Sequence, residues 1–169
     1  SPAVLRAVSG ADGAEIFSVT PPGLELQSGI AAGDIDGDGV AEILANCTES
    51  VCAFDHDGTM KWKSTTFTSE DVGDYSYSPP AISDMDGDGA PEIVFGRVIL
   101  NNDGTLRGKG MYGRGGSIGL EGMSFAVDVD ADGTQEVVVG NALYTPDGAA
   151  IWQNGKTDGF PAVADFDGD

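Results

Sequence analysis

The chain has 169 residues, of which 28 are acidic and eight are basic, and its formal net charge at pH 7 is −20. A hydrophobic fraction of 40% predicts a folded core and argues against a disordered acidic tail. The absence of a basic patch argues against nucleic acid as a partner. The sequence contains no apolar run of about 18 residues, so no membrane span is predicted.

Short strands separated by turns are predicted along the whole chain, because no long stretch has a helical apolar period and the 26 glycines recur between apolar runs. Residues 3–8 and 15–19 are predicted strands around the Asp12-Gly13 turn. Three units of four strands follow. They span 28–65 (strands at 30–33, 43–47, 51–54 and 59–62), 79–110 (81–82, 93–95, 98–100 and from 105) and 123–155 (125–127, 137–139, 142–144 and 149–152).

An acidic loop lies between the first and second predicted strands of each unit. The first loop reads Asp-Ile-Asp-Gly-Asp-Gly-Val-Ala-Glu over 34–42, and the second and third span 84–92 and 128–136. A fourth begins at Asp165 and is cut off at Asp169. The first aspartates are 50, 44 and 37 residues apart, which indicates a repeat architecture.

These loops hold 15 of the 28 acidic residues, four in each complete loop and three in the truncated one. Three aspartates within five residues repel one another unless a cation lies between them. Ca²⁺ accepts six to eight oxygen ligands of this kind. The loops therefore predict calcium sites, and bound calcium is expected to play a structural role.

The second strand of each unit is apolar at consecutive positions, as in Ile93-Val94-Phe95 and Val137-Val138-Val139. Continuous apolarity indicates that both faces of a strand are covered. Four-stranded sheets stacked around an axis satisfy this requirement, so the predicted fold is an all-β propeller of four-stranded antiparallel blades.

Both ends of the chain look like parts of blades. Residues 1–20 are predicted to be the outer strands of one blade, and 158–169 the first strand and truncated loop of another. The two ends either belong to one blade or to a longer parent propeller. An open propeller exposes strand edges, so a second copy is a candidate partner for self-association.

The repeated Asp-x-Asp-x-Asp-Gly-x-x-Glu pattern resembles the FG-GAP (VCBS-type) repeat family, the calcium-binding blades of the integrin α-subunit propeller and its bacterial relatives. That resemblance implies side-chain ligands at loop positions one, three, five and nine and a backbone carbonyl ligand at position seven. The implied ligands are Asp34, Asp36, Asp38, Val40 and Glu42; Asp84, Asp86, Asp88, Ala90 and Glu92; Asp128, Asp130, Asp132, Thr134 and Glu136; and, in the truncated loop, Asp165, Asp167 and Asp169.

Two other interpretations of the loops stay open. An EF-hand requires an acid at position twelve, where this chain has Ala45, Phe95 and Val139. The loops would otherwise be acidic surface turns that bind no metal.

Cys47 and Cys52 lie on either side of a predicted hairpin, where a disulfide is expected, with two free buried thiols as the alternative. A disulfide would place the protein in an oxidising compartment, so a secreted or cell-surface location is expected.

The favoured function is a recognition or adhesion module of a bacterial protein, without enzymatic activity, that binds an unknown protein or carbohydrate. The links 65–78 and 108–122 would form its binding face, through Tyr75, Tyr77, Met111, Tyr112 and Arg114. A propeller of a secreted rhamnogalacturonan-type lyase is the alternative, although the one histidine, His56, is predicted to lie on the surface. The third possible function is that of a scaffold within a larger toxin or adhesin.

Overall fold

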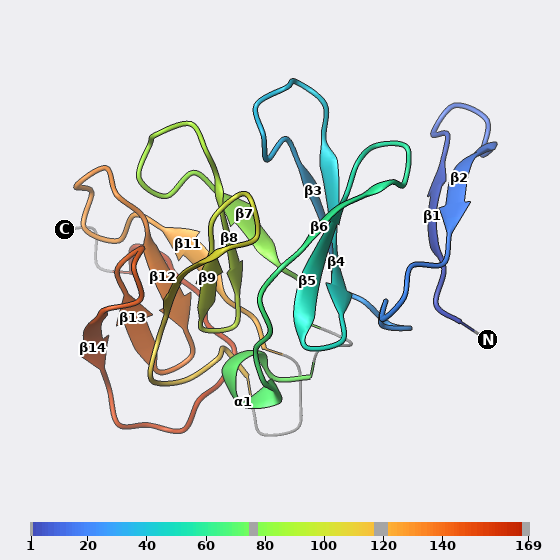
Figure 1. Cartoon of the computed structure of the whole chain (residues 1–169). Coiled ribbons are helices and arrows are strands. Elements are labelled where there is room, and N and C mark those ends of the chain that lie inside the picture. Colours follow the sequence, from blue (N-terminus) through green and yellow to red (C-terminus); the bar gives the residue numbers. More distant parts are fainter. Residues whose placement is uncertain (1, 75–77, 117–121, 167–169) are drawn as a thin grey trace.

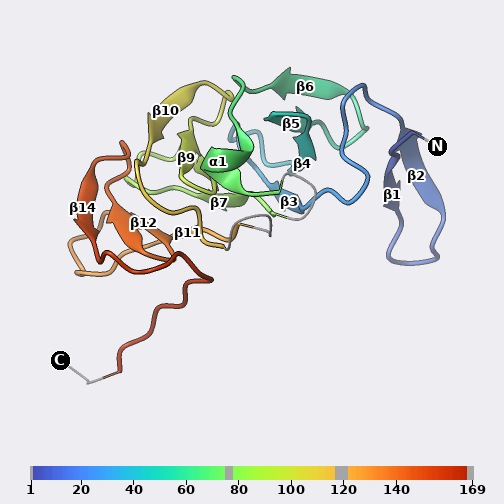
Figure 2. The ribbon, with the colours of Figure 1, turned by 90° about the horizontal axis from the view of Figure 1, so that it is seen from below.

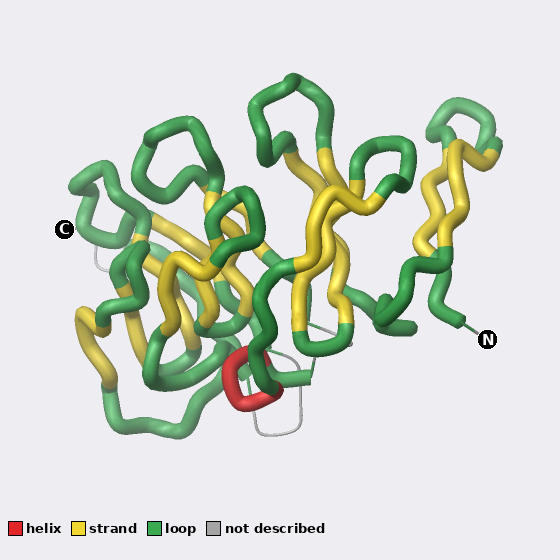
Figure 3. Tube along the Cα trace, viewed as in Figure 1, coloured by secondary structure: helices red, strands yellow, loops and turns green. Residues whose placement is uncertain are grey.

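A computed structural model describes residues 2–74, 78–116 and 122–166 and shows an all-β chain with a single short helix in that part (Figures 1 and 3). The strands are β1 (Leu5–Val8), β2 (Glu15–Val19), β3 (Ile30–Gly33), β4 (Glu42–Cys47), β5 (Ser50–Phe54), β6 (Met60–Lys63), β7 (Ala81–Ser83), β8 (Glu92–Phe95), β9 (Val98–Leu100), β10 (Leu106–Lys109), β11 (Phe125–Val127), β12 (Glu136–Val139), β13 (Ala142–Tyr144) and β14 (Ala150–Gln153). The helix α1 spans Ser69–Val72.

Within each sheet, strands that are consecutive in the sequence pair with each other. β1 and β2 form a two-stranded N-terminal hairpin, and the next twelve strands form three four-stranded sheets in which every pair is antiparallel. We refer to β3–β6, β7–β10 and β11–β14 as the first, second and third sheets. The prediction of an all-β chain of four-stranded antiparallel units is confirmed.

The sheets lie side by side in chain order, from the N-terminal hairpin to the third sheet (Figure 2). Their first strands face one another, since β7 contacts both β3 and β11. The three acidic loops all project from one edge of this row, and α1 lies at the opposite edge (Figure 1). The described residues form an open row rather than a closed ring.

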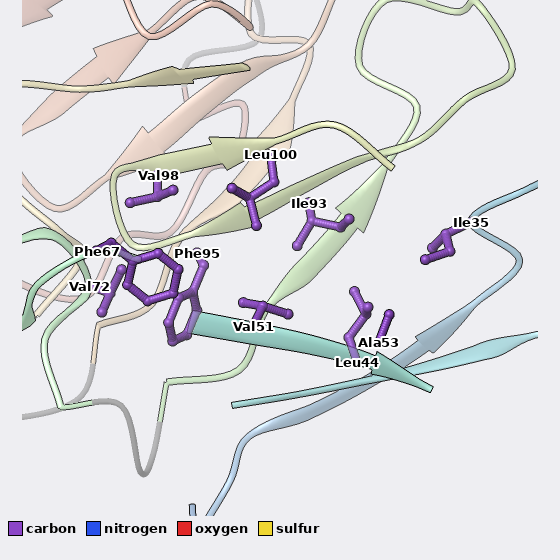
Figure 4. Close-up of a cluster of buried hydrophobic side chains, with 10 residues drawn as sticks. All are labelled: Ile35, Leu44, Val51, Ala53, Phe67, Val72, Ile93, Phe95, Val98 and Leu100. Carbon is purple, nitrogen blue, oxygen red and sulfur yellow. The ribbon is translucent and has the colours of Figure 1, made fainter. Parts of the chain in front are cut away.

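Apolar side chains fill the space between neighbouring sheets. Ile35 and Leu44 of the first sheet and its loop pack with Ile93 and Leu100 of the second sheet (Figure 4). A second cluster joins Met85 to the third sheet, and a third joins Leu5 of the hairpin to the first sheet. β8 and β12 are buried along their whole length, so the prediction that both faces of these strands are covered is confirmed.

Aromatic side chains also contact glycines across the sheet boundaries. A Cβ atom at Gly58 would lie 2.7 Å from the Phe17 ring, and one at Gly104 would lie 2.6 Å from the Trp62 ring. Both glycines belong to Asp-Gly turns and have φ angles of +85° and +80°. Between the second and third sheets Gly108 replaces the aromatic residue, and its Cβ would lie 2.2 Å from the Asp147 carbonyl oxygen. The last two sheets therefore approach backbone to backbone.

Two segments differ from the prediction. The link 65–78 contains α1, a four-residue helix that begins after Thr68, whose backbone N–H donates to Asp71 Oδ2 at 3.1 Å. This single turn is too short to produce an apolar period in the sequence. The first strand of a further blade, expected within 158–169, is not formed among the described residues, where no neighbouring strand pairs with this segment. No helix in the described part of the chain has the length and apolar character needed to cross a membrane.

Candidate metal centres

Hairpin register brings the two ends of each acidic loop together. Gly33 pairs with Glu42 across β3 and β4, so Asp34, the next residue, lies beside Glu42. The same register pairs Ser83 with Glu92 and Val127 with Glu136. Loop position nine, expected just before the second strand, is in the structure the first residue of that strand.

Three carboxylates converge in each loop. Their oxygens lie within 4.8 Å of one another in groups formed by positions one, three and nine. The groups are Asp34, Asp36 and Glu42; Asp84, Asp86 and Glu92; and Asp128, Asp130 and Glu136. Twelve carboxylates were expected to be ligands in the complete loops, and nine of them are gathered in this way.

Loop position five lies outside these groups. Oδ1 of Asp38, Asp88 and Asp132 accepts a hydrogen bond from the backbone N–H of position seven, at 2.7 Å in all three loops. This short side-chain turn orders the peptides of Val40, Ala90 and Thr134, from which the resemblance expects a carbonyl ligand. It also explains why Asp recurs at position five whether or not its other oxygen reaches a cation.

A glycine at position six shapes the loop around position one. The N–H groups of Gly39, Gly89 and Gly133 donate to Oδ2 of the first aspartate at 2.9, 3.1 and 3.0 Å. The φ angles of these glycines are +88°, +88° and +94°, which is a left-handed conformation that disfavours other residues. The sequence pattern Asp-Gly therefore has a conformational cause that does not itself require a metal.

The glutamate at position nine is buried, and one of its oxygens is bound by the loop backbone. The exposed fractions of Glu42, Glu92 and Glu136 are 1, 2 and 5%. Oε2 of each accepts the backbone N–H of position two, at 2.9 to 3.0 Å. Burial raises the pKa of Glu92 above its ordinary value, because a charged carboxylate loses hydration there. A buried carboxylate of this kind requires a cation to remain charged at low cost.

Lysine and arginine supply such cations in the first two loops, which the sequence pattern did not predict. Lys61 Nζ lies 2.5 Å from Asp36 Oδ2 and 3.2 Å from Glu42 Oε1. The hydrogen bond to Lys61 lowers the pKa of Asp36, and the lysine pKa is raised in turn. The sequence feature that could have identified this lysine is its position, since Lys61 is the fourth residue after Asp57 of the Asp-Gly turn.

Arg107 occupies the equivalent place in the second loop, four residues after Asp103. Its Nη2 lies 2.7 Å from Asp86 Oδ2, and its Nη1 pairs with Glu92 Oε1. The hydrogen bond from Arg107 lowers the pKa of Asp86. A third contact, from Nε to Asp147 at 3.2 Å, crosses to the turn of the third sheet.

The donor atoms fit a hard divalent cation. Every side-chain donor in the groups is a carboxylate oxygen, which is the preferred ligand of Ca²⁺. Asp84 Oδ1 is also buried without a hydrogen-bond partner. An orphaned carboxylate oxygen inside an acidic group is a position from which a bound ion would remove the desolvation cost.

The structure describes some of the other residues singled out in the sequence, but not all of them. Cys47 and Cys52 are joined by a disulfide, with a Cα–Cα distance of 5.9 Å, and both are fully buried. Asp165 is described, whereas Asp167 and Asp169 of the fourth loop lie outside the described residues. His56 is exposed in the turn between β5 and β6, as expected.

The expected ligand face lies at the edge of the row opposite the acidic loops. Met111 and Tyr112 are exposed there, and Arg114 lines a hollow of about 350 Å³ together with Arg97, Glu70 and Asp158. Tyr75 and Tyr77 lie outside the described residues.

Comparisons with known proteins identify similar folds. No family model matches the chain, and no curated protein matches it. The V. cholerae biofilm matrix protein Bap1 matches 88% of this chain with 28% identity and a TM-score of 0.67. The exotype rhamnogalacturonan lyase YesX matches 89% with 20% identity and a TM-score of 0.52. The chain spans 23% of the Bap1 chain and 29% of the YesX chain.

Proposed function

We propose that this chain is a calcium-binding β-propeller module of the FG-GAP type, in which Ca²⁺ holds the first two strands of each blade together. The observation that carries the proposal is the recurrence of the same carboxylate group, at the same hairpin, in three successive sheets. Acidic surface turns with no ligand would not need to converge, or to bury the glutamate at position nine.

The stacking of the sheets supports a propeller arrangement. The residue at loop position two is covered by the next sheet, since Ile35 and Met85 are fully buried. Its equivalent in the third loop, Val129, is 41% exposed, and Trp152 beside it is 47% exposed. These two residues line an apolar hollow of about 440 Å³. In the proposed propeller a further four-stranded unit covers this face, supplied by the same protein or by a second copy.

The proposed role of the module is recognition or adhesion outside the cell. Similarity to a biofilm matrix protein supports this role, and the disulfide supports an oxidising compartment. The identity to the lyase is 20%, a level at which the likeness concerns the fold alone, and we propose no lyase activity for this chain. The ligand is a protein or carbohydrate that binds the face carrying Met111 and Tyr112, where exposed aromatic and apolar side chains suit recognition.

Calcium stoichiometry tests the proposal. Isothermal titration of the chelator-treated protein is expected to give three calcium ions per chain, with magnesium bound much more weakly. The Asp84→Asn variant should lose one site. Asp103→Asn is the matched control, because Asp103 lies in an Asp-Gly turn of the same sheet outside the acidic group. No calcium binding by the folded protein would overturn the proposal.

A further inference from the structure

The three acidic loops differ in one surrounding side chain. The fourth residue after the aspartate of each Asp-Gly turn is Lys61 in the first sheet, Arg107 in the second and Ile151 in the third. Lys61 and Arg107 each bridge the carboxylates at positions three and nine of their own loop. Ile151 is half exposed on β14 and supplies no charge.

The third loop consequently keeps all its negative charge. Glu136 Oε2 accepts the Val129 N–H at 3.0 Å, and Asp130 Oδ1 accepts the Asp132 N–H at 3.2 Å. Within residues 2–74, 78–116 and 122–166, no lysine or arginine forms an ion pair with the carboxylates of this loop. The four carboxylates of residues 128–136 thus have only backbone hydrogen-bond donors among the described residues.

We infer that the residue at this position of the fourth strand sets the calcium affinity of each loop, so that the third loop binds calcium more tightly than the first two. This inference rests on the proposed function, because it concerns the affinity of the same sites. A lysine or arginine bound to positions three and nine cancels one negative charge close to where the ion binds. It also engages Glu42 Oε1 and Glu92 Oε1, which calcium would otherwise use.

The physical effect has a definite direction. Calcium affinity rises with the number of charged ligands and falls when a positive charge lies a few ångströms from the site. The basic side chain must either leave its two carboxylates or remain beside a divalent ion. Both routes cost free energy in the first two loops, and neither applies to the third. Lys61 and Arg107 also keep the first two loops paired when calcium is absent.

Three glycine amides allow each loop to be followed separately in the intact chain. Gly39, Gly89 and Gly133 donate to the first aspartate of their loops, so calcium bound to that aspartate shifts their amide signals. A calcium titration of the ¹⁵N-labelled protein, recorded by NMR, measures a midpoint for each. The Gly133 signal is expected to move first, at a calcium concentration about tenfold below those of the other two.

Substitutions then test the cause. Ile151→Lys should shift the Gly133 midpoint to about tenfold higher calcium, whereas Ala150→Lys adds the same charge at the adjacent exposed residue of β14 and should change it much less. Lys61→Met should lower the Gly39 midpoint. Lys63→Met, on the same strand without an ion pair to the loop, is its control.

The outcomes separate the inference from the proposed function. If none of the three glycine signals responds to calcium in the folded protein, the proposed function itself fails. If all three respond with one midpoint, or if Ile151→Lys acts no more strongly than Ala150→Lys, calcium binding stands and the inference is overturned. Either of these outcomes is expected if the basic side chain only stabilises the contact of β6 or β10 with the loop and does not affect calcium affinity.

Discussion

The ring of Trp62 lies against the backbone of Gly104 in the next sheet, so closely that a Cβ atom on the glycine would lie 2.6 Å from the ring. Phe17 contacts Gly58 in the same way one sheet earlier. The turn glycines thus have two roles, because they adopt a left-handed conformation and also accept an aromatic side chain from the preceding sheet.

These two roles can be separated by substitution. Gly13→Ala introduces a Cβ where no atom lies within 4 Å, so it should cost only the left-handed strain, about 1 kcal/mol of the free energy of unfolding. Gly104→Ala should cost about 1–3 kcal/mol more, because the Cβ displaces the Trp62 ring. Urea unfolding with calcium present measures both. Equal losses would show that the Trp62 contact contributes nothing.

Much of this fold could be predicted from the sequence. The four strands of each unit, the Asp-Gly turns and the acidic loops have short-range signals, since short apolar runs and turn residues act within a few positions. The contacts of Trp62 with Gly104 and of Arg107 with Asp147 could not be predicted, because they depend on how closely neighbouring sheets approach. Gly108, which stands where the other units have an aromatic residue, indicates a break in the repeat. It does not by itself reveal that the second and third sheets approach each other more closely.

Calcium removal should destabilise the protein. A ligand that binds only the folded state adds about 2.7 kcal/mol per site at a hundredfold excess over its dissociation constant. For a chain of this size each kcal/mol corresponds to roughly 2–4 °C in Tm. Thermal melts in calcium and in chelator, followed by circular dichroism, measure the difference. An equal Tm in both would contradict a structural role for calcium, and magnesium at the same ionic strength serves as the control.

Asp71 gives stability a pH dependence at the edge opposite the acidic loops. Its burial acts to raise its pKa, but hydrogen bonds from the Thr68 backbone and from Arg97 and Lys109 outweigh this and hold the pKa below its usual 3.8. The folded pKa is thus lower than the unfolded one. The stabilisation is fully present above about pH 4 and is lost as the pH falls through the folded value.

The Asp71→Asn variant tests this sign. At pH 7 it should lose about 2–4 kcal/mol, because Arg97 is left half buried without its carboxylate. Its deficit relative to the native chain should shrink as the pH is lowered from 5 to 2. Urea titrations at fixed pH give both quantities, and Glu70→Gln, at an exposed position of the same helix, is the control. A deficit that stays constant with pH would rule out the ionised carboxylate as its source.

The disulfide should contribute to stability without being needed for the fold. Cys47 and Cys52 enclose a very short loop, for which the chain-entropy model gives about 2 kcal/mol. The double variant Cys47→Ala/Cys52→Ala should remain folded and lose about that amount in urea. Intact-mass measurement after alkylation, with and without reductant, shows whether the thiols are bonded in the native chain. Alkylation at both cysteines without reductant would contradict the bond.

The site was only partly predictable, for a reason that applies to each loop. Local spacing identified Asp34, Asp36 and Glu42, because hairpin register brings loop ends together. It did not show that position five would lie outside the group, since Asp38 has the same side chain as Asp36 and both are followed by a glycine. Lys61 was missed because the strand that carries it is two strands away from the loop in the sheet.

The order of the sheets has a consequence for how the molecule opens. The first and second sheets are each packed on two neighbours, whereas the third sheet packs on the second alone, so the stability of each sheet depends mainly on these boundaries. β5 is buried along its length, between the hairpin and the second sheet, whereas β14 is exposed at every residue. Amide protons should therefore exchange with solvent first in β14 and last in β4 and β5. Local unfolding is then expected to begin at the third sheet, whose outer strand is exposed.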